Sequence, residues 1–110
     1  MSKYINPVSG SNVTADCSVA ANGGILVNCI VEVPASGGTL VSPNGTAFSV
    51  SLPGITANGF VGEVLTGGTT ENMTPCTLEY DDDNDVVLVK SPLGIAVGKA
   101  NAFSGFIAMK

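Results

Sequence analysis

The chain has 110 residues, with nine acidic residues against four lysines and no arginine, which gives a net charge of −5. Binding to a phosphate backbone needs clustered cations, so this balance excludes a nucleic-acid partner and disfavours an anionic membrane surface. The chain has no histidine, which excludes Ser-His-Asp and Cys-His catalysis within it and every His-ligated metal site.

The exterior is expected to be unusually neutral. Hydrophobic residues make up 45% of the chain and charged residues 12%, whereas an average soluble domain is about 25% charged. We therefore expect a homo-oligomer or an assembly component, over a monomer with many small loop residues. No apolar run approaches a transmembrane helix, and the first residues lack the apolar stretch of a signal peptide. The product is expected to stay in the cell unless it leaves as part of a particle.

An arm and a hairpin come first along the chain. Residues 1–11 show little periodicity and are expected to form an N-terminal arm, followed by a single β domain over residues 12–110. Residues 12–33 alternate apolar and polar positions on both sides of an Asn-Gly-Gly turn. A three-residue loop there places Cys17 opposite Cys29 and puts both apolar rows on one face.

The three cysteines show no C-x-x-C spacing. In a reducing cytosol we interpret Cys17, Cys29 and Cys76 as buried thiols that pack as small apolar groups. The expected opposition of Cys17 and Cys29 leaves a disulfide between them as the alternative, after release into an oxidising medium. A three-thiolate metal site is disfavoured.

Asn-Gly pairs at residues 44–45 and 58–59 predict two further turns. The first is expected to close a hairpin with a two-residue loop that pairs Val41 with Phe48. The second precedes a predicted strand over residues 60–65.

Residues 67–75 are expected to form a polar loop. The strands 76–80 and 86–90 then flank an acidic run, and a five-residue loop would pair Tyr80 with Val86. That register also gives a consistent apolar face.

A short strand over residues 95–97, a loop and a last strand over residues 103–109 complete the chain. The total is eight or nine short strands, and no window shows a helical stripe closed by caps. Short antiparallel strands at this spacing predict an all-β fold, a single small β-sandwich or barrel.

The acidic run offers the one conspicuous candidate site. Asp81, Asp83 and Asp85 alternate, and hard cations such as Ca²⁺ prefer carboxylate oxygens. However, the glycine and the distal glutamate of an EF-hand loop are missing. We interpret the run as a solvated turn whose charges discourage edge-to-edge pairing, with a Ca²⁺ site as the alternative. Paired-carboxylate hydrolysis is disfavoured because nothing places a second acid in a cleft, so we expect neither enzymatic activity nor a cofactor.

Three stretches of the chain carry a family resemblance. Residues 60–65 read FVGEVL, residues 77–80 read TLEY and residues 102–107 read AFSGFI. Together with the opening MSKYINP, they resemble the small head-decoration, or cement, proteins of tailed bacteriophages, of the lambda decoration protein type.

The resemblance implies a non-enzymatic virion protein, made in the host cytoplasm and located on the capsid surface. It would bind the major capsid protein from outside, often as a trimer, and stabilise the head. Arm residues are expected to touch the shell and residues of the last strand to lie near a subunit contact, while one alternate face fills the core. The expected contact residues are Tyr4, Ile5, Pro7, Phe103, Phe106 and Ile107.

Two other interpretations remain. A receptor-binding or fibre-tip β domain of a phage tail or head fibre would bind sugars through loops, although two tyrosines and no tryptophan leave few stacking platforms. A host-derived enzyme or lectin-like module is the other. Glycan binding would favour the fibre interpretation, and binding to empty mature capsids would favour decoration.

Overall fold

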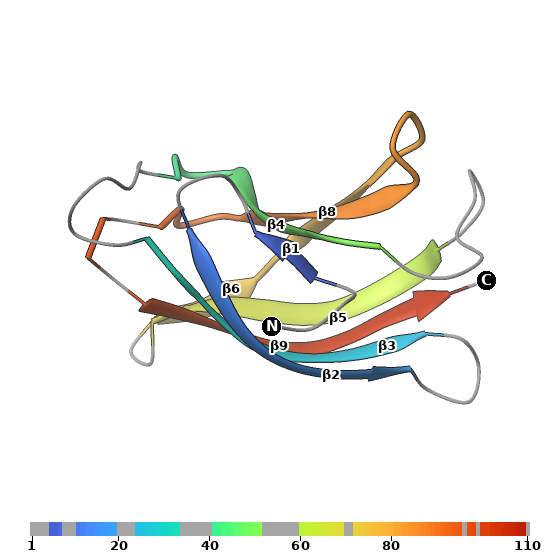
Figure 1. The fold of residues 1–110 in the computed structure, drawn as a ribbon, viewed down its shortest axis with the longest axis horizontal. Helices are drawn as coiled ribbons and strands as arrows, with labels where there is room; N and C mark the ends of the chain where they lie inside the picture. Colours follow the sequence, from blue (N-terminus) through green and yellow to red (C-terminus); the bar gives the residue numbers. More distant parts are fainter. Residues whose placement is uncertain are drawn as a thin grey trace.

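The computed structural model describes residues 5–7, 11–19, 24–33, 41–51, 60–69, 72–95, 97–98 and 100–109, which form nine strands and no helix (Figure 1). The strands are β1 (Ile5–Pro7), β2 (Asn12–Val19), β3 (Ile25–Glu32), β4 (Gly45–Val50), β5 (Phe60–Thr69), β6 (Asn72–Pro75), β7 (Thr77–Asp81), β8 (Val86–Ser91) and β9 (Ala100–Met109). One antiparallel sheet has the order β1-β4-β8-β7 and the other β2-β3-β9-β5-β6. The two sheets pack together as a β-sandwich, which confirms the predicted all-β class.

Alternate residues of the strands fill the space between the two sheets. On β3 the odd-numbered side chains are buried and the even-numbered ones are exposed, as expected for a sheet with one face in water. Phe48 of the four-stranded sheet and Phe103 of the five-stranded sheet are fully buried, and their rings meet edge to face with centroids 5.1 Å apart. Such a pair adds roughly 0.5–1.5 kcal/mol beyond the burial of its area. It ties the two sheets together inside the core.

The predicted hairpin of residues 12–33 is present as β2 and β3, but its register differs by two residues. Cys17 pairs with Val27, and Cys29 pairs with Ala15. The predicted opposition of Cys17 and Cys29 is therefore wrong. The alternative of a disulfide between them depended on that opposition and loses its support. The chain between the two strands is longer than the three residues expected. A shift of two residues keeps every residue on its face, so the burial pattern of β3 is still the predicted one.

The turn at residues 44–45 is present but joins other strands than predicted. The N–H of Gly45 donates to the carbonyl oxygen of Ser42 at 2.8 Å, and Asn44 has a φ of 65°, as at the third position of a type II turn. Val41 bridges to Ile95 instead of to β4. β4 pairs with β1 and β8, so the predicted local hairpin is wrong.

The predicted polar loop of residues 67–75 is also wrong, because β5 continues into this region and pairs with β6. Gly67 makes this continuation compatible with the core. It pairs with Phe103, and a Cβ on Gly67 would lie 2.3 Å from the Phe103 ring. Only a residue without a side chain lets the ring lie across β5 there. The predicted turn at residues 58–59 lies outside the described residues.

The hairpin of β7 and β8 is present, one residue out of the predicted register. Asp81 extends β7 and pairs with Val86, so Tyr80 pairs with Val87. As a result Val87 and Val89 are buried, whereas Val86 is half-buried on the opposite side of β8.

β9 lies in the middle of the five-stranded sheet, between β3 and β5. It begins at Ala100, earlier than the predicted start at residue 103. The predicted short strand over residues 95–97 is reduced to isolated bridges, from Ile95 to Val41 and from Val97 to Val33.

β1 places part of the predicted arm inside the domain. Ile5 pairs with Val50 of β4 and is 1% exposed. The predicted boundary at residue 11 is therefore wrong for β1, and burial excludes Ile5 as a shell contact. Pro7 ends the same strand, and Tyr4 lies outside the described residues.

Candidate interaction surface

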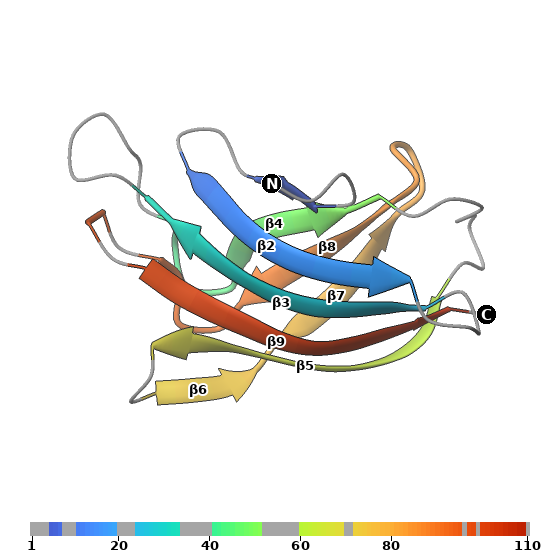
Figure 2. The ribbon, with the colours of Figure 1, turned by 60° about the horizontal axis from the view of Figure 1, so that its bottom comes forward.

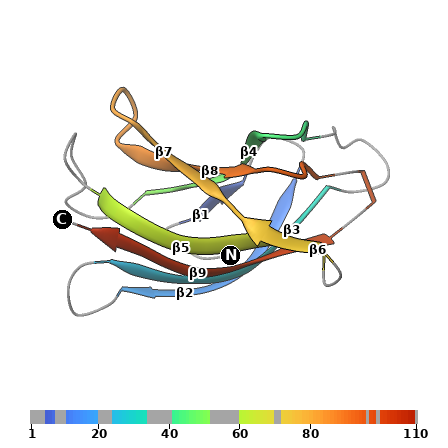
Figure 3. The same cartoon turned by 180° about the vertical axis from the view of Figure 1, so that it is seen from behind.

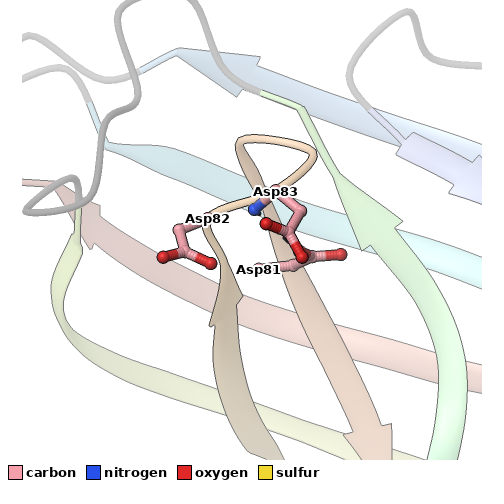
Figure 4. Close-up of side chains that lie close together, drawn as sticks. All are labelled: Asp81, Asp82 and Asp83. Carbon is pink, nitrogen blue, oxygen red and sulfur yellow. Dashed lines mark hydrogen bonds between the residues drawn. The ribbon is translucent and has the colours of Figure 1, made fainter.

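The acidic residues form a tight turn at the end of β7 (Figure 4). The Asp81 carboxylate accepts a hydrogen bond from the main-chain N–H of Asp83 at 3.1 Å and another from the side-chain amide of Asn84 at 2.8 Å. The Asn84 hydrogen bond is the main cause of a lowered pKa at Asp81, and the main-chain N–H groups of Asp83 and Asn84 lower it further. Asp81 therefore stabilises its own turn.

The carboxylate of Asp85 accepts a hydrogen bond from a side chain outside the predicted set of cation ligands. The Tyr80 hydroxyl donates a hydrogen bond to the Asp85 carboxylate. The pKa of Tyr80 is raised to about 12, first by desolvation and then by the hydrogen bond to Asp85 and the negative charges of the turn. The three carboxylates that lie close together are therefore not the predicted Asp81, Asp83 and Asp85. Carboxylate oxygens of Asp81, Asp82 and Asp83 lie within 4.8 Å of one another instead.

These three aspartates are the one such group of potential metal ligands in the part of the chain that the structure describes. Asp82 and Asp83 are exposed, and Asp81 is already an acceptor for the turn. This arrangement favours the interpretation of the acidic run as a solvated turn over a Ca²⁺ ligand set.

The predicted contact residues of the last strand fall on two different faces. Phe103 and Ile107 are fully buried between the sheets, so they are core residues and the expectation of a surface contact is wrong for both. Phe106 is half-buried on the outward side of β9. Its ring lies over Gly24, where a Cβ would approach the ring to 2.6 Å. Phe106 alone of the three remains available to a partner.

β3 and β9 lie side by side at the front of the five-stranded sheet in Figure 2. Around Phe106, their outward side carries large exposed apolar side chains. Leu26 is 52% exposed and pairs with Phe106, and Ile30 is 47% exposed and pairs with Ala102. The two residues between these pairs are also uncharged. We call the set the β3–β9 outer face: Leu26, Asn28, Ile30, Ala102, Ser104 and Phe106.

None of the six residues of the β3–β9 outer face is charged; Glu32 lies at its end, and Asp16 of β2 pairs with Asn28 at its border. Burial of a charge costs several kcal/mol when its partner is poor. A partner that covers only these six residues therefore strands no charge. The sheet beneath is held from inside by the core, so the face is a preformed surface rather than one that must be ordered on binding.

Sequence reasoning missed Leu26 and Ile30 because strict alternation assigns the even positions of β3 to water. A signal was present in two uninterrupted apolar triplets, Ile25-Leu26-Val27 and Cys29-Ile30-Val31. A strand with only one buried face would carry polar residues at both central positions. The triplets thus mark a strand whose second face also carries apolar residues.

Comparison of the chain with protein-family models, with curated proteins and with solved structures finds no match. The described residues include no helix that is long and apolar enough to cross a membrane. Fold and surface define a class, an all-β sandwich with an uncharged apolar face on one sheet.

Proposed function

We propose that the protein is a non-enzymatic structural subunit of a phage virion that binds the outer surface of the capsid and stabilises it. The β3–β9 outer face carries the proposal. It exposes two large aliphatic side chains beside a phenyl ring, and none of its six residues is charged. A sheet face of this composition is typical of a surface that is buried against another subunit.

The choice of decoration among virion roles depends on the sequence resemblance. The three stretches that carry it lie in β5, β7 and β9. The stretch in β9 includes Phe106 and Ala102, which belong to the β3–β9 outer face. The partner in this proposal is the major capsid protein, and the resemblance implies a trimer.

Stabilisation of a shell needs no chemistry in this proposal. A partner that binds only the assembled shell shifts the equilibrium toward assembly by mass action. Subunits that are themselves linked gain effective concentration, so their avidity exceeds a single contact by about 10²–10⁴. A rigid sandwich with one apolar face suits this role.

The test is co-sedimentation of the purified protein with undecorated mature capsids of the phage that encodes it. We expect saturable binding by the parent and at least about tenfold weaker binding by Leu26→Asp, which places a charge in the buried contact. Leu93→Asp is the matched control. Leu93 is 49% exposed but lies outside the β3–β9 outer face, so its binding should stay at the parent level.

Two outcomes would contradict the proposal. One is equal loss of binding by both variants while both melt like the parent. The other is no capsid binding together with specific binding to a bacterial surface glycan, which would favour the fibre-tip alternative. The arm is tested by removing residues 1–4 alone, because removal of residues 1–11 would also remove β1 and the buried Ile5.

A further inference from the structure

The four sheet edges differ in their protection against pairing with another strand. β1 is three residues long and ends at Pro7, and β6 is four residues long and ends at Pro75. β7 carries Glu79 and Asp81 and runs into the acidic turn. Short length, proline and charge are the usual devices that block edge pairing.

β2 has none of these devices except a single charge. It is eight residues long, contains no proline, glycine or lysine, and carries one charged residue, Asp16. It pairs with β3 and with no other strand among those described. In an antiparallel ladder about half of its main-chain N–H and C=O groups therefore point away from β3. Figure 2 shows β2 at this free edge of the sheet.

We propose that β2 pairs antiparallel with β2 of a second copy about a two-fold axis, which joins the two five-stranded sheets into one continuous sheet. A two-fold contact uses the same edge on both copies, so it leaves no edge of this length free. Main-chain hydrogen bonds supply the affinity, as in strand addition generally. This contact does not depend on the proposed capsid function, and its two-fold symmetry replaces the trimer that the resemblance implies.

Charge selects the register of the pair. Paired residues must share a face, so two registers overlap over nearly the whole strand: residues 12–18 with Ala15 on the axis, or residues 13–19 with Asp16 on the axis. The second register sets Asp16 directly opposite its own copy, and like charges so placed are destabilising. The first sets Asp16 opposite Thr14 of the second copy. We therefore assign the register with Ala15 on the axis.

The same residue positions indicate which strand would pair with the free edge of β2. In this register Asn12 stands opposite Ser18, and Val13 stands opposite Cys17, so polar positions meet polar ones and apolar positions meet apolar ones. β2 is thus complementary to itself in the antiparallel direction. A strand of another protein would have to supply an unprotected edge with the same pattern.

The test is a charge substitution at Thr14 read out by native mass measurement and sedimentation equilibrium on the full chain. Thr14 pairs with the exposed Ile30, so its position lies on the outward side. Thr14→Lys places a cation opposite Asp16 of the second copy and should tighten the dimer about 2- to 30-fold, because the axis makes each pair occur twice. Thr14→Glu places like charges there and should weaken the dimer by a similar factor.

Thr69→Lys and Thr69→Glu are the matched controls, since Thr69 is exposed at the end of β5 and pairs with Asn72. Neither should change the dimer. Hydrogen exchange should show additional protection of β2 amides as the protein concentration rises. A monomer at every concentration, a trimer, or a dimer that responds equally to Thr14 and Thr69 would overturn the proposal. Protection of β2 only when capsids are added would assign the edge to a shell strand instead.

Discussion

The two lateral sides of the sandwich end in different ways. On one side the chain crosses directly from one sheet to the other: β6 ends at Pro75, β7 begins at Thr77, and only Cys76 lies between them (Figure 3). On the other side β1 and β2, the edge strands of the two sheets, are joined through the longer stretch of residues 8–11. We call these the closed side and the open side.

Several contacts among the described residues hold the closed side. The N–H of Cys76 donates to the carbonyl oxygen of Leu65 at 2.8 Å, and Cys76 is 8% exposed. Its sulfur lies 3.0 Å from where a Cβ on Gly67 would be, and Phe103 packs on the same glycine. On this side the edges β6 and β7 are also protected by proline and by charge, so we expect association through strand pairing at the open side.

The largest expected effect comes from breaking the packing of the closed side. Phe103→Ala removes the ring that contacts Phe48 and lies over Gly67, and should lower the free energy of unfolding by about 3–5 kcal/mol. Urea denaturation measures it. Phe106→Ala is the matched control on the same strand, and its loss should be much smaller because that ring is half-buried on the outer face. Equal losses would mean that β9 is not buried on one side only.

A smaller effect is expected from the thiol at the cross-over. Burial raises the pKa of Cys76 from 9.0 to about 11. The folded state then holds a proton that the unfolded state releases, so stability is fully present below pH 9 and falls as the pH rises toward 11. The loss should approach about 2–3 kcal/mol, at about 1.4 kcal/mol per unit of pKa shift.

Other groups titrate in the same range, so the measurement is the difference between the parent and Cys76→Ala across that range. The parent should lose more stability than the variant. At lower pH, alkylation of Cys76 in the folded protein should be about 100-fold slower than in the unfolded chain, because the thiolate is the reactive form. Parallel stability curves for the two proteins would contradict a desolvated thiol at the cross-over.

The faces of the strands could be predicted from the sequence more reliably than their partners. Alternation in β2 and β3 determines which residues point inward, but a shift of two residues satisfies it equally well, and the longer connection selected Val27 as the partner of Cys17. In β8 the run Val86-Val-Leu-Val89 is apolar on both faces. Alternation therefore could not decide between registers. The observed register follows instead from the extension of β7 to Asp81.

Local sequence patterns could not predict which strands pair when they are far apart in the chain. Asn44-Gly45 has turn chemistry, and the turn forms, but β4 then pairs with β1 and β8 from opposite ends of the chain. Ile5 looked like part of an arm because three residues are too few to show a period. The candidate surface was missed for a related reason. Exposure of Leu26 and Ile30 depends on what covers the second face of the sheet, which a single strand's pattern does not encode.

The smallest expected effect lies at the acidic turn, where β7, the four-stranded sheet's edge on the closed side, ends. The carboxylate of Asp85 accepts a hydrogen bond from Tyr80 and contributes negative charge, and both favour the neutral phenol. Asp85→Asn keeps the turn, because Asn tolerates the positive φ of 53° at this position. It removes the charge, so the pKa of Tyr80 should fall from about 12 toward the ordinary 10.0.

Phenolate absorbance measures this shift, in a Tyr4→Phe background that leaves Tyr80 as the one tyrosine. Asp83→Asn is the matched control, since Asp83 makes its hydrogen bond to Asp81 and its charge is not among the causes of the Tyr80 shift. A downward shift of the same size in both variants would show that the turn acts only through its total charge. A shift confined to Asp85→Asn would show that the turn holds a defined hydrogen bond at the end of β7. β7 would then be an edge protected by an ordered acidic cap, and β2 has no counterpart to it among its own residues.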